Sequence, residues 1–167
     1  RKPAYTVNEL LATGIPQTAK IGGLAVVFIV TLGIPLGVIS ALKSNSTIDY
    51  GVMIIATVGI TVPSFVIGSL FILLAQNVDW IPVGGLSTPI SYVGPVVALS
   101  GYSLAFVTRL TRSRMLEVLR QDYVRTARAN GLSEFKVIFK HALKNSLIPV
   151  VTYVGPMIAA VMTGSFV

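Results

Sequence analysis

Four long stretches of this chain contain no charged side chain, and each is at least 22 residues long. An α-helix rises about 1.5 Å per residue, so about 20 apolar residues cross the hydrocarbon core of a bilayer. A soluble fold would have to bury four such helices, and 167 residues cannot enclose them all in one core. The pattern therefore predicts an all-α integral membrane protein with about four transmembrane helices. The charge-free stretches are Ile21–Leu42, Tyr50–Val78, Trp80–Thr108 and Asn145–Val167.

The composition agrees with a chain that lies mostly in lipid. Hydrophobic residues make up 53% and charged residues 11% of the sequence, whereas soluble domains carry about 25% charged residues. Cysteine is absent, which excludes disulfides, thiolate metal sites and cysteine nucleophiles. The chain begins at Arg1 without a methionine and ends within an apolar run, so we expect residues 1–167 to be a single partial transmembrane domain. The expected spans are about 21–42, 51–75, 93–108 and 147–167.

Positive charge collects in one block and sets the expected orientation. Residues 109–144 hold nine of the thirteen Lys and Arg residues, and basic loops of membrane proteins face the cytoplasm. The segment 109–146 is therefore expected in the cytoplasm. The loop Asp79–Tyr92, which lacks Lys and Arg, is expected outside. This orientation leaves ten basic residues inside and three outside, and the three that run against the usual bias are Arg1, Lys2 and Lys20.

Proline interrupts the second expected span. Pro63 lacks a backbone donor and its ring collides with the carbonyl four residues back, so neighbouring groups must satisfy the freed backbone within a membrane. Thr61 and Ser64 place hydroxyls beside the break. Two interpretations stay open: a translocation path lined by Thr61, Pro63 and Ser64, or a static packed kink. In the first span, Gly33 and Gly37 are spaced for a close helix contact, although a proline lies between them.

The cytoplasmic block has the pattern of two amphipathic helices joined by a glycine turn. Between Ser113 and Asn130, apolar residues recur at helical spacing on one face. Gly131 can adopt the left-handed conformation that ends a helix, Leu132 follows on the turn, and Ser133 can cap the second helix. Such helices either lie on anionic lipid headgroups or meet a protein partner. The apolar faces comprise Met115, Leu116, Leu119, Tyr123 and Ala127 in the first helix, and Phe135, Ile138, Phe139 and Ala142 in the second.

Three segments share a recognisable order of residues: RLTRSRMLEVL at 109–119, DYVRTARANGL at 122–132 and HALKNSLIP at 141–149. A cluster of small residues is followed by a glycine and, farther on, by a Leu-x-Pro-like end. This order resembles the cytoplasmic "EAA" loop in permease subunits of bacterial ABC importers of the dipeptide/oligopeptide (and nickel) class. Ala127, Gly131 and Pro149 occupy the matching positions, and Arg-Thr-Ala at 125–127 stands where Glu-Ala-Ala would be.

The resemblance implies a partial ABC importer type I permease-like helical bundle, a six-helix subunit without its first and last helices. It also implies cytoplasmic ABC ATPase subunits, a second permease subunit in a heterodimer, and an external substrate-binding protein. The resemblance further implies that the protein lies in the cell (inner) membrane of a bacterium or archaeon and that its substrate is a peptide. The segment that couples to the ATPase would comprise Arg125, Thr126, Ala127, Arg128, Ala129, Gly131, Leu132 and Ser133.

Other chemistry is not indicated by the sequence. No Walker sequence is present, so ATPase activity is expected on a partner subunit and this chain is not expected to be an enzyme. We expect no cofactor, no nucleic-acid partner and no metal site, since His141 is the single histidine. The alternative function is an ATP-independent channel or secondary carrier for small polar solutes, which usually needs an ionisable group that the expected spans lack. Glu117 and Asp122 are expected to form solvent-screened pairs with neighbouring arginines.

Overall fold

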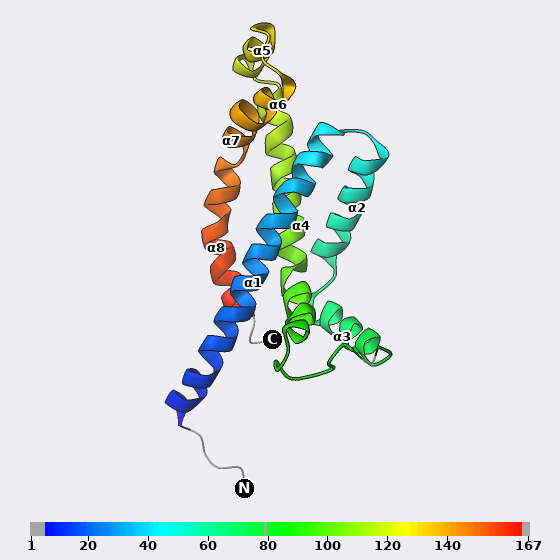
Figure 1. The fold of residues 1–167 in the computed structure, drawn as a ribbon, viewed down its shortest axis with the longest axis vertical. Helices are drawn as coiled ribbons and strands as arrows, with labels where there is room; N and C mark the ends of the chain where they lie inside the picture. The colour runs from blue at the N-terminus through cyan, green and yellow to red at the C-terminus, as the bar shows by residue number, and fades with distance from the viewer. Residues whose placement is uncertain (1–5, 79, 165–167) are drawn as a thin grey trace.

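The computed structural model describes residues 6–78 and 80–164, and these residues form helices and connecting turns without a β-strand (Figure 1). The predicted all-α class is confirmed. Some predicted features lie outside the described residues: the external charges Arg1 and Lys2, the first residue of the expected loop Asp79–Tyr92, and residues 165–167 of the last expected span. The elements are α1 (Val7–Leu42), α2 (Thr47–Thr61), α3 (Ser64–Ala75), the 3-10 turn η1 (Pro89–Tyr92), α4 (Val93–Leu119), α5 (Asp122–Ala129), α6 (Glu134–Lys136), the π-helical turn η2 (Val137–Ala142), α7 (Leu143–Ser146) and α8 (Ile148–Gly164).

Two helical stretches are long and apolar enough to cross a membrane unaided. They are Ala12–Leu42 and Pro89–Leu119, of 31 residues each. Two bent pairs qualify when each is counted as one span: α2 with α3, at 103°, and the stretch Glu134–Ser146 with Ile148–Thr163, at 46°. The chain is thus a helical protein with two to four candidate spans among the described residues, and the exact span limits stay a prediction.

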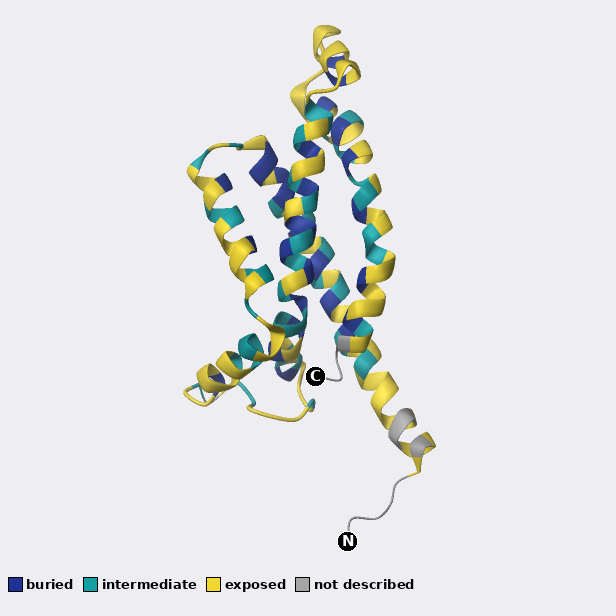
Figure 2. Ribbon diagram, turned by 180° about the vertical axis from the view of Figure 1, so that it is seen from behind, coloured by how far each residue is buried: buried dark blue, intermediate teal, exposed yellow. Residues whose placement is uncertain are grey.

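Helix α4 lies at the centre of the bundle and packs against α1, α2, α3 and α8 (Figure 1). The main core cluster joins Ile29 of α1, Val107 of α4 and Val150 of α8, and Figure 2 shows buried residues concentrated along the facing sides of the central helices. Gly37 brings α1 close to α4, because a Cβ at this position would stand 2.6 Å from the carbonyl oxygen of Thr108. The predicted close contact of the glycine pair in α1 is therefore confirmed.

The chain turns sharply between α2 and α3. Val62 has extended backbone angles, φ −86° and ψ 120°, which is the conformation that a following proline favours. Pro63 then stands at the start of α3, and its carbonyl accepts hydrogen bonds from the N–H groups of Val66 and Ile67. The two halves of the expected span 51–75 are consequently separate helices, with α3 lying across the end of the bundle opposite α5 (Figure 1).

Candidate coupling site

The segment from residue 120 to residue 146, called here the α5–α7 segment, begins at a break in the helix. Helix α4 ends at Leu119, and Gln121 is extended, with φ −71° and ψ 148°, before α5 starts at Asp122. The carboxylate of Asp122 in the first turn suits the positive end of the helix dipole. The sequence predicted one continuous helix over 113–130, and this prediction was wrong. The break uses neither glycine nor proline, so the sequence pattern does not reveal it.

The break also rotates the inward face of α5. Val124 and Ala127 are buried against Val137, whereas Tyr123 is exposed and its hydroxyl accepts a hydrogen bond from Nδ2 of Asn145 at 2.8 Å. The predicted face placed Tyr123 and Ala127 together, and only Ala127 faces inward. Val124, and not Tyr123, takes the inward position, because the extended residue before α5 shifts the helical phase by one residue.

Gly131 ends α5 in the conformation that its position predicted. Its φ is +76°, and its N–H donates to the carbonyl of Arg128 at 3.0 Å. The next N–H, that of Leu132, donates to the carbonyl of Ala127 at 3.3 Å. These two bonds form a Schellman motif, which satisfies carbonyls that the helix end would leave free. The left-handed glycine turn is thus confirmed, and it fixes the direction in which Leu132 leaves the helix.

An ion pair holds the two sides of this turn together. Nε and Nη2 of Arg128 donate to the two carboxylate oxygens of Glu134 at 3.1 Å and 2.7 Å. The hydrogen bonds from Arg128 lower the pKa of the Glu134 carboxyl below its ordinary value. Two-pronged arginine–carboxylate contacts fix geometry as well as charge, but both side chains are largely exposed, so the energy gained is small. Ser133 precedes α6 as predicted, although its hydroxyl makes no capping hydrogen bond.

The outer surface of the turn is apolar and basic. All predicted coupling residues except Ala127 are exposed. Leu132 is 38% exposed and Phe135 is 69% exposed. The ring of Phe135 lies 4.5 Å, between centroids, from that of Phe139, which is also exposed. Aromatic side chains of this kind are favoured in the centres of protein interfaces. The sequence placed both phenylalanines on an apolar face that meets lipid or a protein partner, and their exposure agrees with this. They are added to the candidate site.

A π-helical turn follows Phe135 and contains Phe139. In η2 the N–H of Leu143 donates to the carbonyl of Ile138, five residues earlier. The wider turn brings Val137 and Ala142 to the buried side at a spacing of five residues. Such turns occur mostly as single insertions into helices and often at functional sites. The predicted α-helical periodicity of this stretch therefore does not hold.

Three other pairs of charged residues lie in or near the α5–α7 segment. Nη1 of Arg114 lies 2.8 Å from the carboxylate of Glu117, and that of Arg125 lies 3.9 Å from Asp122. All four side chains are exposed, so the predicted solvent-screened pairs are confirmed.

The third pair joins a buried acid to a partly exposed arginine and was not predicted. Nε and Nη2 of Arg112 on α4 donate to the two carboxylate oxygens of Asp49 on α2, both at 2.6 Å. Asp49 is 2% exposed and accepts further hydrogen bonds from the hydroxyl of Ser40 and the N–H of Asn45. A single acid between two apolar stretches was the available signal, but its partner lies 63 residues away.

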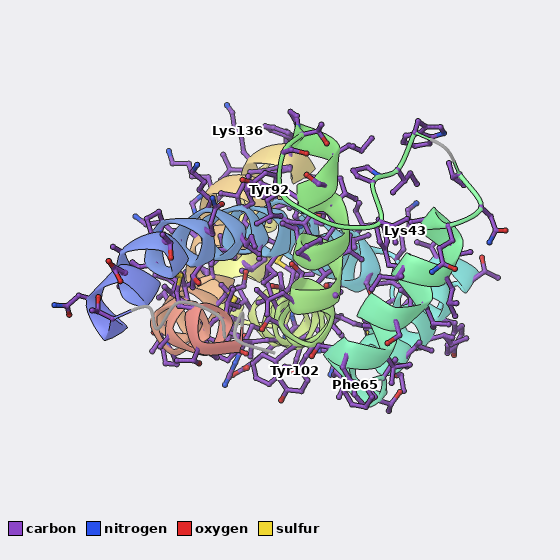
Figure 3. All side chains as sticks on the ribbon, turned by 90° about the horizontal axis from the view of Figure 1, so that it is seen from below. Lys43, Phe65, Tyr92, Tyr102 and Lys136 are labelled. Carbon is purple, nitrogen blue, oxygen red and sulfur yellow. The ribbon has the colours of Figure 1, made fainter. Side chains whose placement is uncertain are left out.

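The break at Pro63 opens onto a cavity of about 390 Å³ between α2, α3, α4 and α8. Pro63 and Ser64 form part of its wall, together with Tyr102 and Ser103 of α4. Thr61 is not in this wall, and its hydroxyl donates to the carbonyls of Thr57 and Val58. Figure 3, viewed along the bundle, places Phe65 and Tyr102 on the same side of the molecule.

Comparison with known proteins gives this geometry its context. Residues 33–167 match the family described as binding-protein-dependent transport system inner membrane component. The chain belongs to this family. It is 46% identical to the dipeptide transport system permease protein DppB of Bacillus subtilis (strain 168), over all of this chain and 54% of that protein. It is 43% identical to the oligopeptide transport system permease protein OppB of Salmonella typhimurium (strain LT2), over 98% of this chain and 54% of that protein.

Membership of the binding-protein-dependent inner membrane components confirms the resemblance drawn from residues 122–132, and with it a helical, multi-pass membrane protein. The chain spans about half the length of the curated relatives it matches. The family match begins at Gly33, in the last third of α1, and covers the break at Pro63, all of α4 and the described α5–α7 segment.

Proposed function

We propose that this chain is part of a permease subunit in an ATP-driven peptide importer, and that the α5–α7 segment couples it to a separate ATPase. The observation that carries the proposal is the preformed turn at Gly131. Its Schellman hydrogen bonds and the Arg128–Glu134 pair hold Leu132 and Phe135 outward without a partner in contact. A rigid apolar and basic tip suits docking because little conformational entropy is lost on binding.

The proposed assembly has four further components. Two cytoplasmic ABC ATPase subunits receive the tips of two permease subunits, which form a heterodimer, and an external binding protein delivers the substrate. The curated relatives named for dipeptide and oligopeptide transport support peptides as the substrate class. In this orientation residues 109–146 lie in the cytoplasm, which agrees with their nine basic residues. ATP binding and hydrolysis belong to the partner subunits.

The path for the substrate is proposed to run past the break between α2 and α3. Irregular backbone at membrane depth persists where it lines a hydrated cavity or is buried in protein. The wall of the cavity at Pro63 includes Ser64, Tyr102 and Ser103, and hydroxyls of such residues can donate to or accept from a passing peptide backbone. Thr61 supports the helix end beside this path through its hydrogen bonds to the preceding turn.

The test uses the full-length permease with its ATPases, partner permease and binding protein in liposomes. Leu132→Asp adds a charge to an exposed apolar position of the tip, so it should leave folding intact while weakening ATPase association at least tenfold and reducing ATP-driven uptake of a radiolabelled tripeptide. Gln76→Glu, at an exposed position at the other end of the bundle, adds the same charge and should change neither quantity. Unchanged association in Leu132→Asp, or uptake that needs no ATP, would reject the proposal.

A further inference from the structure

The pair between the buried Asp49 and Arg112 joins the helix that leads into the α5–α7 segment, α4, to the helix that precedes the break at Pro63, α2. We propose that this pair is the linkage through which a displacement of the α5–α7 segment reaches the break between α2 and α3. Asp49 and Arg112 would be positioning residues of the transport cycle rather than residues that touch the substrate. The inference rests on the proposed function, since it requires an ATPase to move α5.

Between Arg112 and the α5–α7 segment, the helix and its packing are continuous. Arg112 lies on α4, which runs uninterrupted to Leu119 and is separated from α5 by two residues. One turn beyond Arg112 toward α5, Met115 of α4 packs in one cluster with Ala142 of η2. Val118, the next turn along, contacts the cluster of Val124 and Val137. A displacement of the α5–α7 segment therefore carries the end of α4 with it, because closely packed interiors transmit strain.

The side of the linkage toward the break depends on the ion pair. Asp49 stands in the first turn of α2, and Gly59 approaches the carbonyl of Gly101 on α4 near the far end of α2. An apolar cavity of about 310 Å³ runs along α2 and α4, from Val52 past Ala56 to Gly59, and residues of α1 and α3 complete its wall. Packing is therefore incomplete along the middle of the helix pair. The ion pair fixes the position of α2 at the end of this helix nearest the α5–α7 segment.

The chemistry of the pair suits transmission of movement. The Asp49 carboxylate accepts hydrogen bonds from four donors, which belong to Arg112, Ser40 and Asn45. The two-pronged contact to Arg112 specifies direction as well as distance. An apolar contact is non-directional and would let one helix slide on the other. The Ser40 hydroxyl also ties the end of α1 to the same carboxylate, so three helices meet at one group.

The experiment follows two positions in the full-length complex with its ATPases, partner permease and binding protein. Single cysteines replace Asn130, at the end of α5, or Phe65, the exposed residue at the start of α3 (Figure 3). These 167 residues contain no native cysteine, and any cysteine elsewhere in the complex is first replaced. A spin label at each position reports its change in mobility between the nucleotide-free and ATP-bound states. In the unsubstituted background both labels should respond to ATP.

Asp49→Asn is then introduced as the decisive variant. The label at position 130 should keep its response to ATP, while the response at position 65 should fall at least twofold, and fewer tripeptides should be imported per ATP hydrolysed. Arg112→Lys keeps the charge but loses the two-pronged geometry, so it should give an intermediate response. Glu117→Gln breaks the exposed pair on the same helix and should leave both labels unchanged.

Each outcome decides between the two proposals. A full response at position 65 in Asp49→Asn, or in Arg112→Lys where Asp49→Asn does not assemble, would overturn the linkage. Failure of both variants to assemble would assign the pair a purely structural role and overturn it as well. A missing response to ATP at position 130 in the unsubstituted complex would instead reject the proposed coupling to an ATPase.

Discussion

Replacing Gly131 with alanine isolates the contribution of one backbone conformation to the proposed docking tip. The φ of Gly131 is +76°, and no atom lies within 4 Å of the position that a Cβ would take. The substitution therefore introduces no collision, and its whole cost is the strain of an L-residue in the left-handed region. That strain is about 1–2 kcal/mol, which corresponds to a shift of about 5–30-fold in the equilibrium between the closed and open turn.

Hydrogen exchange of the turn amides measures this shift. The N–H groups of Gly131 and Leu132 donate to carbonyls of α5 only when the turn is closed, so they should exchange about 5–30-fold faster in Gly131→Ala than in the unsubstituted protein. Gly131→Asn is the matched control. Asparagine visits the left-handed region more readily than alanine, and the change should stay below about threefold.

Equal exchange in the alanine, asparagine and glycine proteins would refute the assignment of strain to this turn. A different failure is also informative: faster exchange in Gly131→Ala at the buried Val150 of α8 would mean that the whole bundle loosens. The effect would then belong to global stability rather than to the turn.

Three further predictions concern stability in detergent. Gly37→Val should lower the free energy of unfolding by about 1–3 kcal/mol, because its Cβ would meet backbone 2.6 Å away. The control Gly51→Val, with open space around its Cβ, should stay within about 1 kcal/mol in thermal denaturation. Asp49→Asn should destabilise by about 3–5 kcal/mol near neutral pH. Glu134→Gln, which breaks an exposed pair with Arg128, should cost less than about 1 kcal/mol, and high salt should abolish the difference.

The features that the sequence predicted well have local causes. Long charge-free runs predict membrane helices because no other fold can bury them, and the structure has candidate spans in the same regions. Gly131 was predicted to turn because few other residues adopt a positive φ, and it does. Gly37 was predicted to permit close packing, and it lies against Thr108. In each case one residue type or one short pattern carries the physical reason.

The features that the sequence did not predict depend on contacts between distant residues or on the helical phase of a short element. The extended Gln121 shifts the helical phase of α5, so that Val124 is buried and Tyr123 is not. The π-helical turn Val137–Ala142 changes the helical phase again. The partner of Asp49 is 63 residues away, and a single sequence contains no signal that selects Arg112 among thirteen basic residues.

Helix α4 continues without interruption for 27 residues from η1 to the break before α5, a length of about 40 Å. A rod of that length acts as a lever: a tilt of about 10° about one end sweeps the other end through about 7 Å. A small rotation at the end of α4 next to α5 would thus displace the other end of α4, which begins at Val93, by about the width of an amino-acid side chain. Mechanical gain of this kind needs no melting of secondary structure, and only the angle of one helix has to change.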